Sequence, residues 1–198
     1  MYIPKHYEQK DREKLLDFMR AFPFAVMVSA AGEKPVGTHL PFVTEADEDT
    51  LFLYSHLSLA NPQWKSVSNQ QLLVIFSEPH AYISPSLYAH TKNVPTWNYI
   101  AVHAYGSVEW FHDDETKLHI LQKQMASNEE AYLKQFSELP ATYVQNLLKG
   151  IVAFRIRVEE LQGKEKLSQN KTEQERQDIR EHLLRSEDGS AREIGERM

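Results

Sequence analysis

The chain has 198 residues, of which 41% are hydrophobic and 25% are charged, as is typical of a soluble globular protein with a sizeable core. Its 22 lysines and arginines face 28 acidic residues, and the net charge of −6 disfavours a broad nucleic-acid-binding face. Cysteine is absent, which excludes disulfides, thiol nucleophiles and cysteine-based zinc sites. The N-terminus lacks a secretory signal and no apolar run is long enough to span a membrane, so we expect a cytoplasmic protein.

The first half of the chain predicts one helix followed by strands. Apolar spacing predicts a helix over 11–22, with Asp11 as its N-cap and Pro23 as its stop. Further elements are strands over 24–30, 35–44, 51–56, 71–78 and 79–85, and a short helix over about 62–68. The first two strands form a hairpin. Strand 71–78 is apolar on both faces, which indicates burial on both sides.

The longest strand signal covers residues 97–111. Every second residue from Asn98 to Trp110 is mostly apolar and is expected to face a core. Gly106 lies within this set and would allow the strand to bend.

Helices and one more strand are predicted for the remainder. Asp113 caps a helix, a second helix begins at about Pro140, and a strand covers 151–162 before a polar segment over 163–170. Thr172 and Glu175 form a capping-box pattern that opens a charged helix to about Arg185. The last dozen residues are expected to be frayed or disordered.

These elements predict a mainly β (α+β) fold. Several hairpin-connected strands and few crossover helices favour a closed or nearly closed antiparallel barrel with helices packed outside it. We expect one domain over residues 1–171, followed by a charged helix and tail over 172–198.

One stretch, LYSHLSLANPQWKSV (53–67), gathers polar side chains where a strand meets a helix. Asn61 followed by Pro62 is typical of an N-cap and first helical residue, so the first turn would offer N–H groups to an anion. Lys65, His56 and Ser55 would add donors, and a phosphate would fit. The alternative is that Asn61 only caps the helix and His56 only fills space.

Three further stretches carry side chains that suit a polar aromatic ligand. They are THLP (38–41), PTWNY (95–99) and KLSQN (166–170), which contribute His39, Trp97, Asn98, Tyr99, Lys166, Ser168 and Gln169. Turn capping and packing are the alternative roles.

Familiar catalytic and nucleotide-binding motifs are missing from the sequence. It contains no H-E-x-x-H, no G-x-S-x-G, no G-x-G-x-x-G and no P-loop motif, so metal, hydrolase, Rossmann and P-loop readings find no support. A nucleotide-like ligand would therefore have to be held by the barrel itself.

Six ordered blocks, MYIPKHYE, THLPF, SHLSLANPQW, PHAYISPSLY, VPTWNYIAVHAYG and GKEKLSQN, closely resemble the PaiB family of FMN-binding negative transcriptional regulators. The resemblance covers about residues 1–171. It implies an antiparallel split β-barrel with peripheral helices, related in fold to pyridoxamine phosphate oxidases. It also implies a homodimer with FMN at the subunit interface, and repression of protease-production and sporulation genes beside an acetyltransferase of the same operon.

The resemblance implies roles for the polar stretches. The phosphate of FMN would bind at residues 55–65, with His56 and Asn61 as the leading contacts, while His39 and Leu40 would line the flavin ring. The ring or ribityl chain would be flanked by Trp97, Asn98 and Tyr99, and the site closed by Lys166, Ser168 and Gln169. Lys166 is the candidate for stabilising reduced, anionic flavin at its N1–C2=O edge.

Two other functions stay open at this point: a flavin-dependent oxidoreductase acting on a small substrate, and a cofactor-free dimeric scaffold. Direct repression through DNA has its own difficulty. No helix-turn-helix pattern with a basic recognition helix is evident, and the helix over 172–185 mixes acidic and basic residues. An indirect regulatory mechanism, through DNA-bound or other protein partners, is therefore a further reading of the family's role.

Overall fold

The computed structural model describes residues 1–30, 34–67, 71–90 and 92–198. Its strands are β1 (Glu8–Gln9), β2 (Phe24–Ser29), β3 (Val36–Pro41), β4 (Val43–Ala46), β5 (Leu51–Ser58), β6 (Gln71–Phe76), β7 (His80–Ile83), β8 (Thr96–Phe111) and β9 (Ile151–Lys166). Its α-helices are α1 (Arg12–Ala21), α2 (Gln63–Ser66), α3 (Asp114–Glu129), α4 (Tyr132–Ser137), α5 (Ala141–Leu148), α6 (Glu173–Leu184) and α7 (Gly189–Arg197). Two 3-10 turns, η1 (Lys5–Tyr7) and η2 (Pro85–Leu87), complete the described elements.

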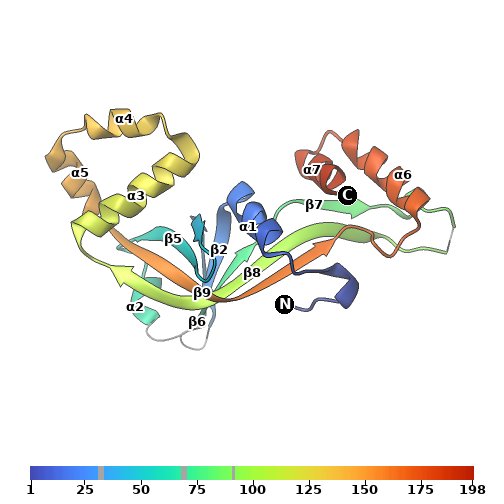
Figure 1. Ribbon diagram of the computed structural model, residues 1–198, viewed down its shortest axis with the longest axis horizontal. Helices are drawn as coiled ribbons and strands as arrows, with labels where there is room; N and C mark the ends of the chain where they lie inside the picture. The colour runs from blue at the N-terminus through green and yellow to red at the C-terminus, as the bar shows by residue number, and fades with distance from the viewer. Residues whose placement is uncertain (31–33, 68–70, 91) are drawn as a thin grey trace. The chain divides into compact units, whose positions relative to one another are not determined.

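The nine described strands belong to one sheet in which the main hydrogen-bonded order is β3-β2-β6-β8-β9-β5-β4 (Figure 1). The pairs β1–β9, β2–β3, β2–β6, β4–β5, β5–β9 and β7–β8 are antiparallel. Outside this path, β1 pairs with β9 and β7 pairs with β8. The predicted antiparallel fold class is confirmed. The path through the described strands runs from β3 to β4 without returning to its start, so the sheet is open, and helix and strand contents are about equal.

The chain divides into two compact units. Unit 1 comprises Met1–Leu15, Ser77–His103 and Gln162–Met198, and unit 2 comprises Leu16–Phe76 and Ala104–Leu161. The long strands β8 and β9 each contribute one part to unit 1 and the other part to unit 2.

Unit 2 has a core of aliphatic and aromatic side chains that come from strands β2, β5, β6 and β9. Met27, Leu53, Leu72, Phe76 and Phe154 are all less than 2% exposed. These residues alternate with partly exposed ones along β2, β5 and β6, because successive side chains of a strand point to opposite faces. The prediction that strand 71–78 is buried on both faces is wrong for this chain, since β6 shows the same alternation as its neighbours.

The single strand expected over 35–44 is divided into β3 and β4. Pro41 ends β3, and proline has no N–H with which to continue a strand ladder. Phe42 then turns its ring into the core, 5.9 Å from the Phe76 ring and 6.2 Å from the Phe154 ring. Burial of an aromatic side chain outweighs strand continuity at this position.

Gly106 of β8 is required by the close approach of β9. A Cβ atom at this position would lie 2.1 Å from the carbonyl oxygen of Arg157, which no side chain can accommodate without a backbone shift. The predicted alternation is confirmed for the first part of the strand, where Asn98, Ile100, Val102 and Ala104 are buried, although Ala101 is buried as well. Val108 and Trp110, predicted to face the core, are only partly buried.

Unit 1 is built around the first part of β8, the last part of β9 and the two C-terminal helices (Figure 1). β7 pairs with the start of β8, and β1 pairs with Gly163 and Lys164 near the end of β9. That second pairing explains why β9 continues to Lys166, beyond the predicted end at 162, into the segment predicted only as polar. A two-residue partner about 155 positions away leaves no local signal in the sequence.

The last dozen residues are ordered, contrary to the expectation of a frayed tail. They form α7, which packs on α6 and β7, with Ile194 fully buried. Ser190 ties the helix to β7, because its hydroxyl accepts a hydrogen bond from the His80 N–H and donates one to the His80 carbonyl, each at 2.8 Å. The capping box predicted at Thr172 and Glu175 is present at the start of α6.

No helix in the described part of the chain is long and apolar enough to cross a lipid bilayer.

Candidate functional site

The predicted site residues fall into two groups, one in each unit. His39, Leu40, Ser55, His56, Asn61 and Lys65 belong to unit 2, whereas Trp97, Asn98, Tyr99, Lys166, Ser168 and Gln169 belong to unit 1. Each group is therefore described within its own unit.

Ser55 and His56 of β5 take part in a hydrogen-bonded network around Gln124 of α3, here called the Gln124 network. The Ser55 hydroxyl, with no exposed surface, donates to the Pro41 carbonyl at 2.7 Å. The Gln124 side-chain amide donates to the same carbonyl at 3.0 Å, and its oxygen lies 2.7 Å from His56 Nδ1. This network fixes the imidazole through one nitrogen and leaves Nε2 as its second polar atom.

Asn61 belongs to a second network around Gln63, here called the Gln63 network. Asn61 Oδ1 accepts the Gln63 N–H at 3.0 Å, and Asn61 Nδ2 donates to the Thr38 hydroxyl. That hydroxyl in turn donates to the Gln63 side-chain oxygen. The Gln63 side-chain nitrogen then donates to Ser29 and to the carbonyls of Met27 and Val36. Gln63, which is 1% exposed, thus connects the start of α2 and the loop before it to β2 and β3.

The α2 helix is shorter than the predicted 62–68. It covers only four residues, so a helix dipole is not available to hold an anion at its start. The predicted N-cap is wrong by one residue, because Pro62 is the N-cap of α2 and makes no side-chain capping hydrogen bond. Asn61 lies one residue earlier, where its side chain accepts the N–H two residues ahead, as in an Asx turn. Lys65 is exposed on α2, with its ammonium 5.3 Å from the centre of the Trp64 ring.

β3 presents an edge and an exposed aromatic pair. Within the described part of the sheet, β3 ends the main strand order and pairs only with β2. His39 lies opposite Val26 in this ladder and stacks on Phe24, with ring centres 6.2 Å apart, and Phe24 is 62% exposed. Leu40 is buried, so its side chain contributes to the core.

In unit 1, three predicted residues meet at a cavity of about 180 Å³, here called the lysine cavity. These are Asn98, Lys166 and Ser168. Residues that the sequence analysis did not select complete its polar lining: Tyr7, Tyr88, Asn93, Thr96, Asn170 and Lys171. They come from η1, the loop before β8, the first residue of β8, and the segment after β9. Thr96 and Asn170 lie inside or next to the selected PTWNY and KLSQN stretches, which is the one signal that pointed to them.

Asn98 and Ser168 form a buried reciprocal pair. Asn98 Nδ2 donates to the Ser168 hydroxyl at 3.0 Å, and that hydroxyl lies 3.1 Å from Asn98 Oδ1. Ser168 has a φ of 61°, in the left-handed region that costs a residue with a side chain about 1–2 kcal/mol. The pair holds the chain in this conformation as it leaves β9.

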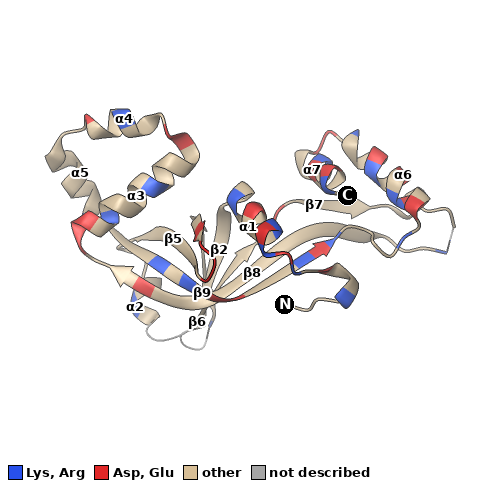
Figure 2. Cartoon of the chain, viewed as in Figure 1, with Lys and Arg blue, Asp and Glu red and all other residues tan. Residues whose placement is uncertain are grey.

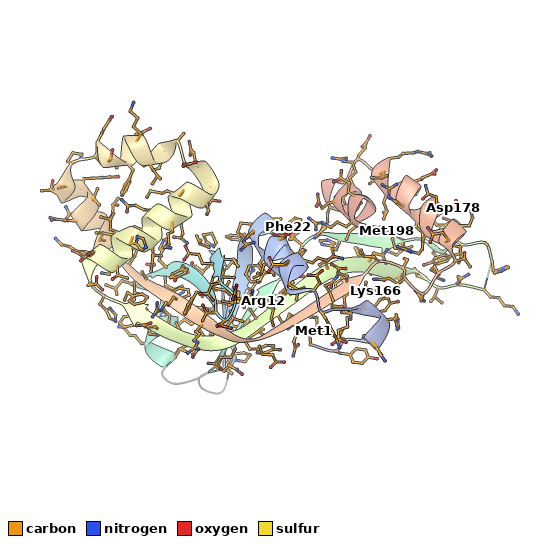
Figure 3. All side chains as sticks on the ribbon, in the orientation of Figure 1. Met1, Arg12, Phe22, Lys166, Asp178 and Met198 are labelled. Carbon is orange, nitrogen blue, oxygen red and sulfur yellow. The ribbon has the colours of Figure 1, made fainter. Side chains whose placement is uncertain are left out.

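Lys166 lies near the end of β9, where Figure 3 labels it. Its ammonium donates to the Thr96 hydroxyl and to the Trp97 carbonyl. Burial, and then the positive charge of Lys164, lower the pKa of Lys166 from its usual value.

Lys171 has a similarly defined position at the lysine cavity. Its ammonium donates to Asn93 Oδ1 at 2.9 Å and lies 3.7 Å from the centre of the Tyr88 ring. Such a cation–π contact helps to hold the ammonium in position.

The other three predicted residues of unit 1 lie outside the lining of this cavity. Trp97 is 52% exposed and packs edge-on against Tyr82, with ring centres 5.8 Å apart. Tyr99 lies under Lys164, whose ammonium is 5.1 Å from the ring centre. Gln169 folds back on its own segment by accepting the Leu167 N–H and donating to the Glu165 carbonyl.

Comparisons with known proteins agree with this fold and with the resemblance described above. The model of a family described as "Putative FMN-binding domain" matches residues 1–160. The chain is 36% identical to "Protease synthase and sporulation protein PAI 2" of Bacillus subtilis (strain 168), over all of this chain and 96% of that protein.

Solved structures share the fold at low identity. The flavocytochrome Anf3 from Azotobacter vinelandii matches with a TM-score of 0.66 and 17% identity, over 83% of this chain and 72% of its own. The FAD and heme binding protein from Mycobacterium smegmatis matches with a TM-score of 0.61 and 17% identity, over 81% and 73% of the two chains. These likenesses identify the fold as that of the split-barrel flavoproteins. The chain belongs to the PaiB family of FMN-binding domains, and this membership gives it FMN as its cofactor.

Proposed function

We propose that this protein is an FMN-binding negative regulator of protease-production and sporulation genes, and that it acts in the cytoplasm as a homodimer. The observation that carries the proposal is the family match over residues 1–160, together with full-length likeness to a relative named for protease synthesis and sporulation. FMN binding is the part of this role that can be tested directly, by substituting residues of unit 2 and unit 1.

The chain has side chains that suit each part of FMN. The exposed Phe24–His39 pair and the free edge of β3 suit a flat ring with hydrogen-bonding groups along its rim. His56 and Lys65 supply a second imidazole nitrogen and an exposed ammonium for the phosphate. Leu40, Ser55 and Asn61 support these residues from within, through packing and the two networks. FMN would supply redox chemistry, while these side chains hold and orient it.

The residues of unit 1 are proposed as a second group of flavin contacts. Lys166 would place a positive charge beside the flavin, and Trp97 and Tyr99 would offer aromatic surface. Asn98, Ser168 and Gln169 would shape the segment that carries Lys166. Exposed Trp97 and Tyr82 also form an aromatic surface on β7 and β8 that suits a second copy of the chain. Sedimentation of the purified protein at several concentrations tests the dimer.

FMN retention is the first experiment. The purified chain is mixed with FMN and desalted, and we expect flavin absorbance to elute with the protein at one FMN per chain. The Lys65→Gln variant should retain less FMN at an unchanged melting temperature, because Lys65 is exposed and its ammonium lies over the Trp64 ring at the surface. Lys134→Gln, on the exposed face of α4, removes the same charge elsewhere and is the control.

A second pair of variants tests the predicted phosphate contacts. His56→Ala combined with Asn61→Ala should weaken FMN retention, and full occupancy in this double variant would refute the assignment. Because both residues also belong to internal networks, the melting temperature is measured alongside. A protein that stays colourless under all conditions would instead favour the cofactor-free scaffold.

Regulation is proposed to be indirect. The helices α6 and α7 carry interleaved acidic and basic residues (Figure 2), and α7 has Arg192 and Arg197 balanced by Glu193 and Glu196. Such a surface does not suit the phosphate backbone of DNA. We expect no salt-dependent shift of promoter fragments by the pure protein, and increased reporter expression when the gene is deleted. A shift that weakens steeply with salt would contradict the indirect mechanism and indicate DNA as a direct partner.

The oxidoreductase alternative is tested with the same FMN-loaded protein. Bleaching of the flavin by NADH or NADPH, followed by repeated turnover with a small acceptor, would favour an enzyme over a regulator.

A further inference from the structure

The lysine cavity carries more positive charge than its surroundings balance. Its lining includes Lys166 and Lys171 and no aspartate or glutamate. Within the described residues neither lysine forms a salt bridge, whereas Lys117 pairs with Asp114 and Lys123 pairs with Glu45. Glu175, which does not line the cavity, lies close enough to Lys171 for the two charges to interact, so one carboxylate stands near two ammonium groups. Two partly buried ammonium groups that face one cavity are costly unless further negative charge offsets them.

The hydrogen bonds of the two lysines leave donors for such an anion. An ammonium group has three N–H bonds, and Lys166 uses two of them, on Thr96 and on the Trp97 carbonyl. Lys171 uses one, on Asn93 Oδ1. The partners are neutral oxygens, which fix the position of each ammonium without neutralising its charge.

Further polar groups of the lining have suitable chemistry. The Tyr7 hydroxyl donates to Asn170 Oδ1 at 3.2 Å, which leaves the Asn170 amide nitrogen as a donor at the same cavity. Burial raises the pKa of both Tyr7 and Tyr88, so both phenols stay protonated near neutral pH. The lining therefore presents cations and neutral donors.

The volume of the cavity limits what it can hold. Sites for whole drug-sized ligands occupy roughly 300–1,000 Å³. At about 180 Å³, the lysine cavity suits a charged group of a few heavy atoms, not an entire flavin.

We propose that the lysine cavity binds the oxyanion group, phosphate or carboxylate, of a small molecule through Lys166 and Lys171. The oxyanion could belong to a small free acid or to the phosphate of FMN itself. The inference shares Lys166 with the proposed flavin site, but its test measures oxyanion binding in the absence of flavin. A failure here is thus distinguishable from a failure of FMN binding.

The first experiment titrates the full chain, freed of FMN, with inorganic phosphate in a calorimeter. Lys166→Gln and Lys171→Gln should each weaken phosphate binding about tenfold, because each removes a charge-assisted hydrogen bond. Lys92→Gln is the matched control, since Lys92 is exposed and one residue from Asn93 but does not line the cavity. Lys171→Arg keeps the charge and should retain most of the affinity.

The second experiment repeats the titration with FMN-loaded protein. Unchanged phosphate affinity would identify a separate small-molecule oxyanion as the ligand. Release of one FMN per phosphate bound would identify the phosphate of FMN as the oxyanion. Competition by acetate would extend the site to carboxylates.

The proposal is overturned if the folded wild-type chain does not bind phosphate. It is also overturned if Lys92→Gln weakens binding as much as the two cavity variants do. Circular dichroism spectra and melting temperatures of the variants are compared first, and Lys171→Arg decides the matter if either glutamine variant fails to fold.

Discussion

The two units use their buried polar residues differently. In unit 2, Gln63 and Gln124 are neutral, almost fully buried and hydrogen-bonded to backbone carbonyls and hydroxyls. In unit 1, the lysine cavity places two ammonium groups beside hydroxyls and amides without a carboxylate. A neutral network with most donors and acceptors paired within the chain holds strands and loops in register, whereas unbalanced cations with remaining donors suit a ligand.

The largest effect is expected from the long strands that the two units share. Gly106→Ala should lower the free energy of unfolding by about 3 kcal/mol or more, because the new methyl would meet the backbone of Arg157. Gly163→Ala in unit 1 should cost less, about 1–2 kcal/mol, since its nearest neighbour is the flexible end of Leu15, although the Gln9 carbonyl is also close. Urea unfolding monitored by circular dichroism measures both, and equal losses would mean that unit 1 is packed as rigidly as unit 2.

The next largest effect is expected in the Gln63 network, where a substitution tests whether these neutral hydrogen bonds stabilise unit 2. Gln63→Leu keeps the side-chain volume but leaves the carbonyls of Met27 and Val36 without this donor. We expect a loss of about 2–3 kcal/mol in unfolding free energy, measured by urea denaturation. Gln135→Leu, at an exposed position of α4, should change it by less than about 0.5 kcal/mol. A loss below 1 kcal/mol for Gln63→Leu would show that water replaces the side-chain amide.

A smaller effect is expected at Ser168. Ser168→Ala removes both hydrogen bonds to the buried Asn98 side chain and keeps the positive φ, so it should cost about 1–2 kcal/mol. Ser168→Gly loses the same bonds but relieves the backbone, and should be about 1 kcal/mol more stable than the alanine variant. Thermal melts of the two variants check this order, and an alanine variant as stable as the glycine variant would mean that φ relaxes.

The smallest effect concerns the acid stability of unit 1. Hydrogen bonding, first from the backbone of Thr172, lowers the pKa of Glu175 in the folded chain. A carboxyl group with a depressed folded pKa stabilises the protein above its unfolded value of 4.5, and this stabilisation is lost as the pH falls through the folded pKa. Glu175→Gln should therefore flatten the dependence of melting temperature on pH below about 5. Glu173→Gln, exposed on the same helix, should leave the slope unchanged.

The sequence predicted the elements whose signals are local. Alternation along the first part of β8, the Asp11 cap of α1 and the Thr172–Glu175 box are patterns within a few residues, and the structure contains all of them. The length of β9 depends on its pairing with β1, and the formation of α7 depends on its packing against β7. Both partners are distant in the sequence, so no short window of the sequence contains that information.

The polar stretches were recognised as a group, but their separate roles could not be predicted. Ser55 and Asn61 are the same residue types as Ser168 and Asn98, and both pairs lie in polar stretches of the sequence. The former belong to the networks of unit 2 and the latter line a cavity. Gln124 and Lys171 carried no signal, because their significance comes from side chains more than 60 residues away, His56 and Asn93.

The division of the chain into interleaved segments has a consequence for its synthesis. All residues of unit 2 have been joined once residue 161 is added, whereas unit 1 still lacks Gln162–Met198. Lys166, Ser168 and Lys171 all belong to this segment, so the lysine cavity is completed only after the last residue of unit 2 has been added. Neither unit is a continuous piece of the gene, and recombination cannot transfer one without cutting through the other.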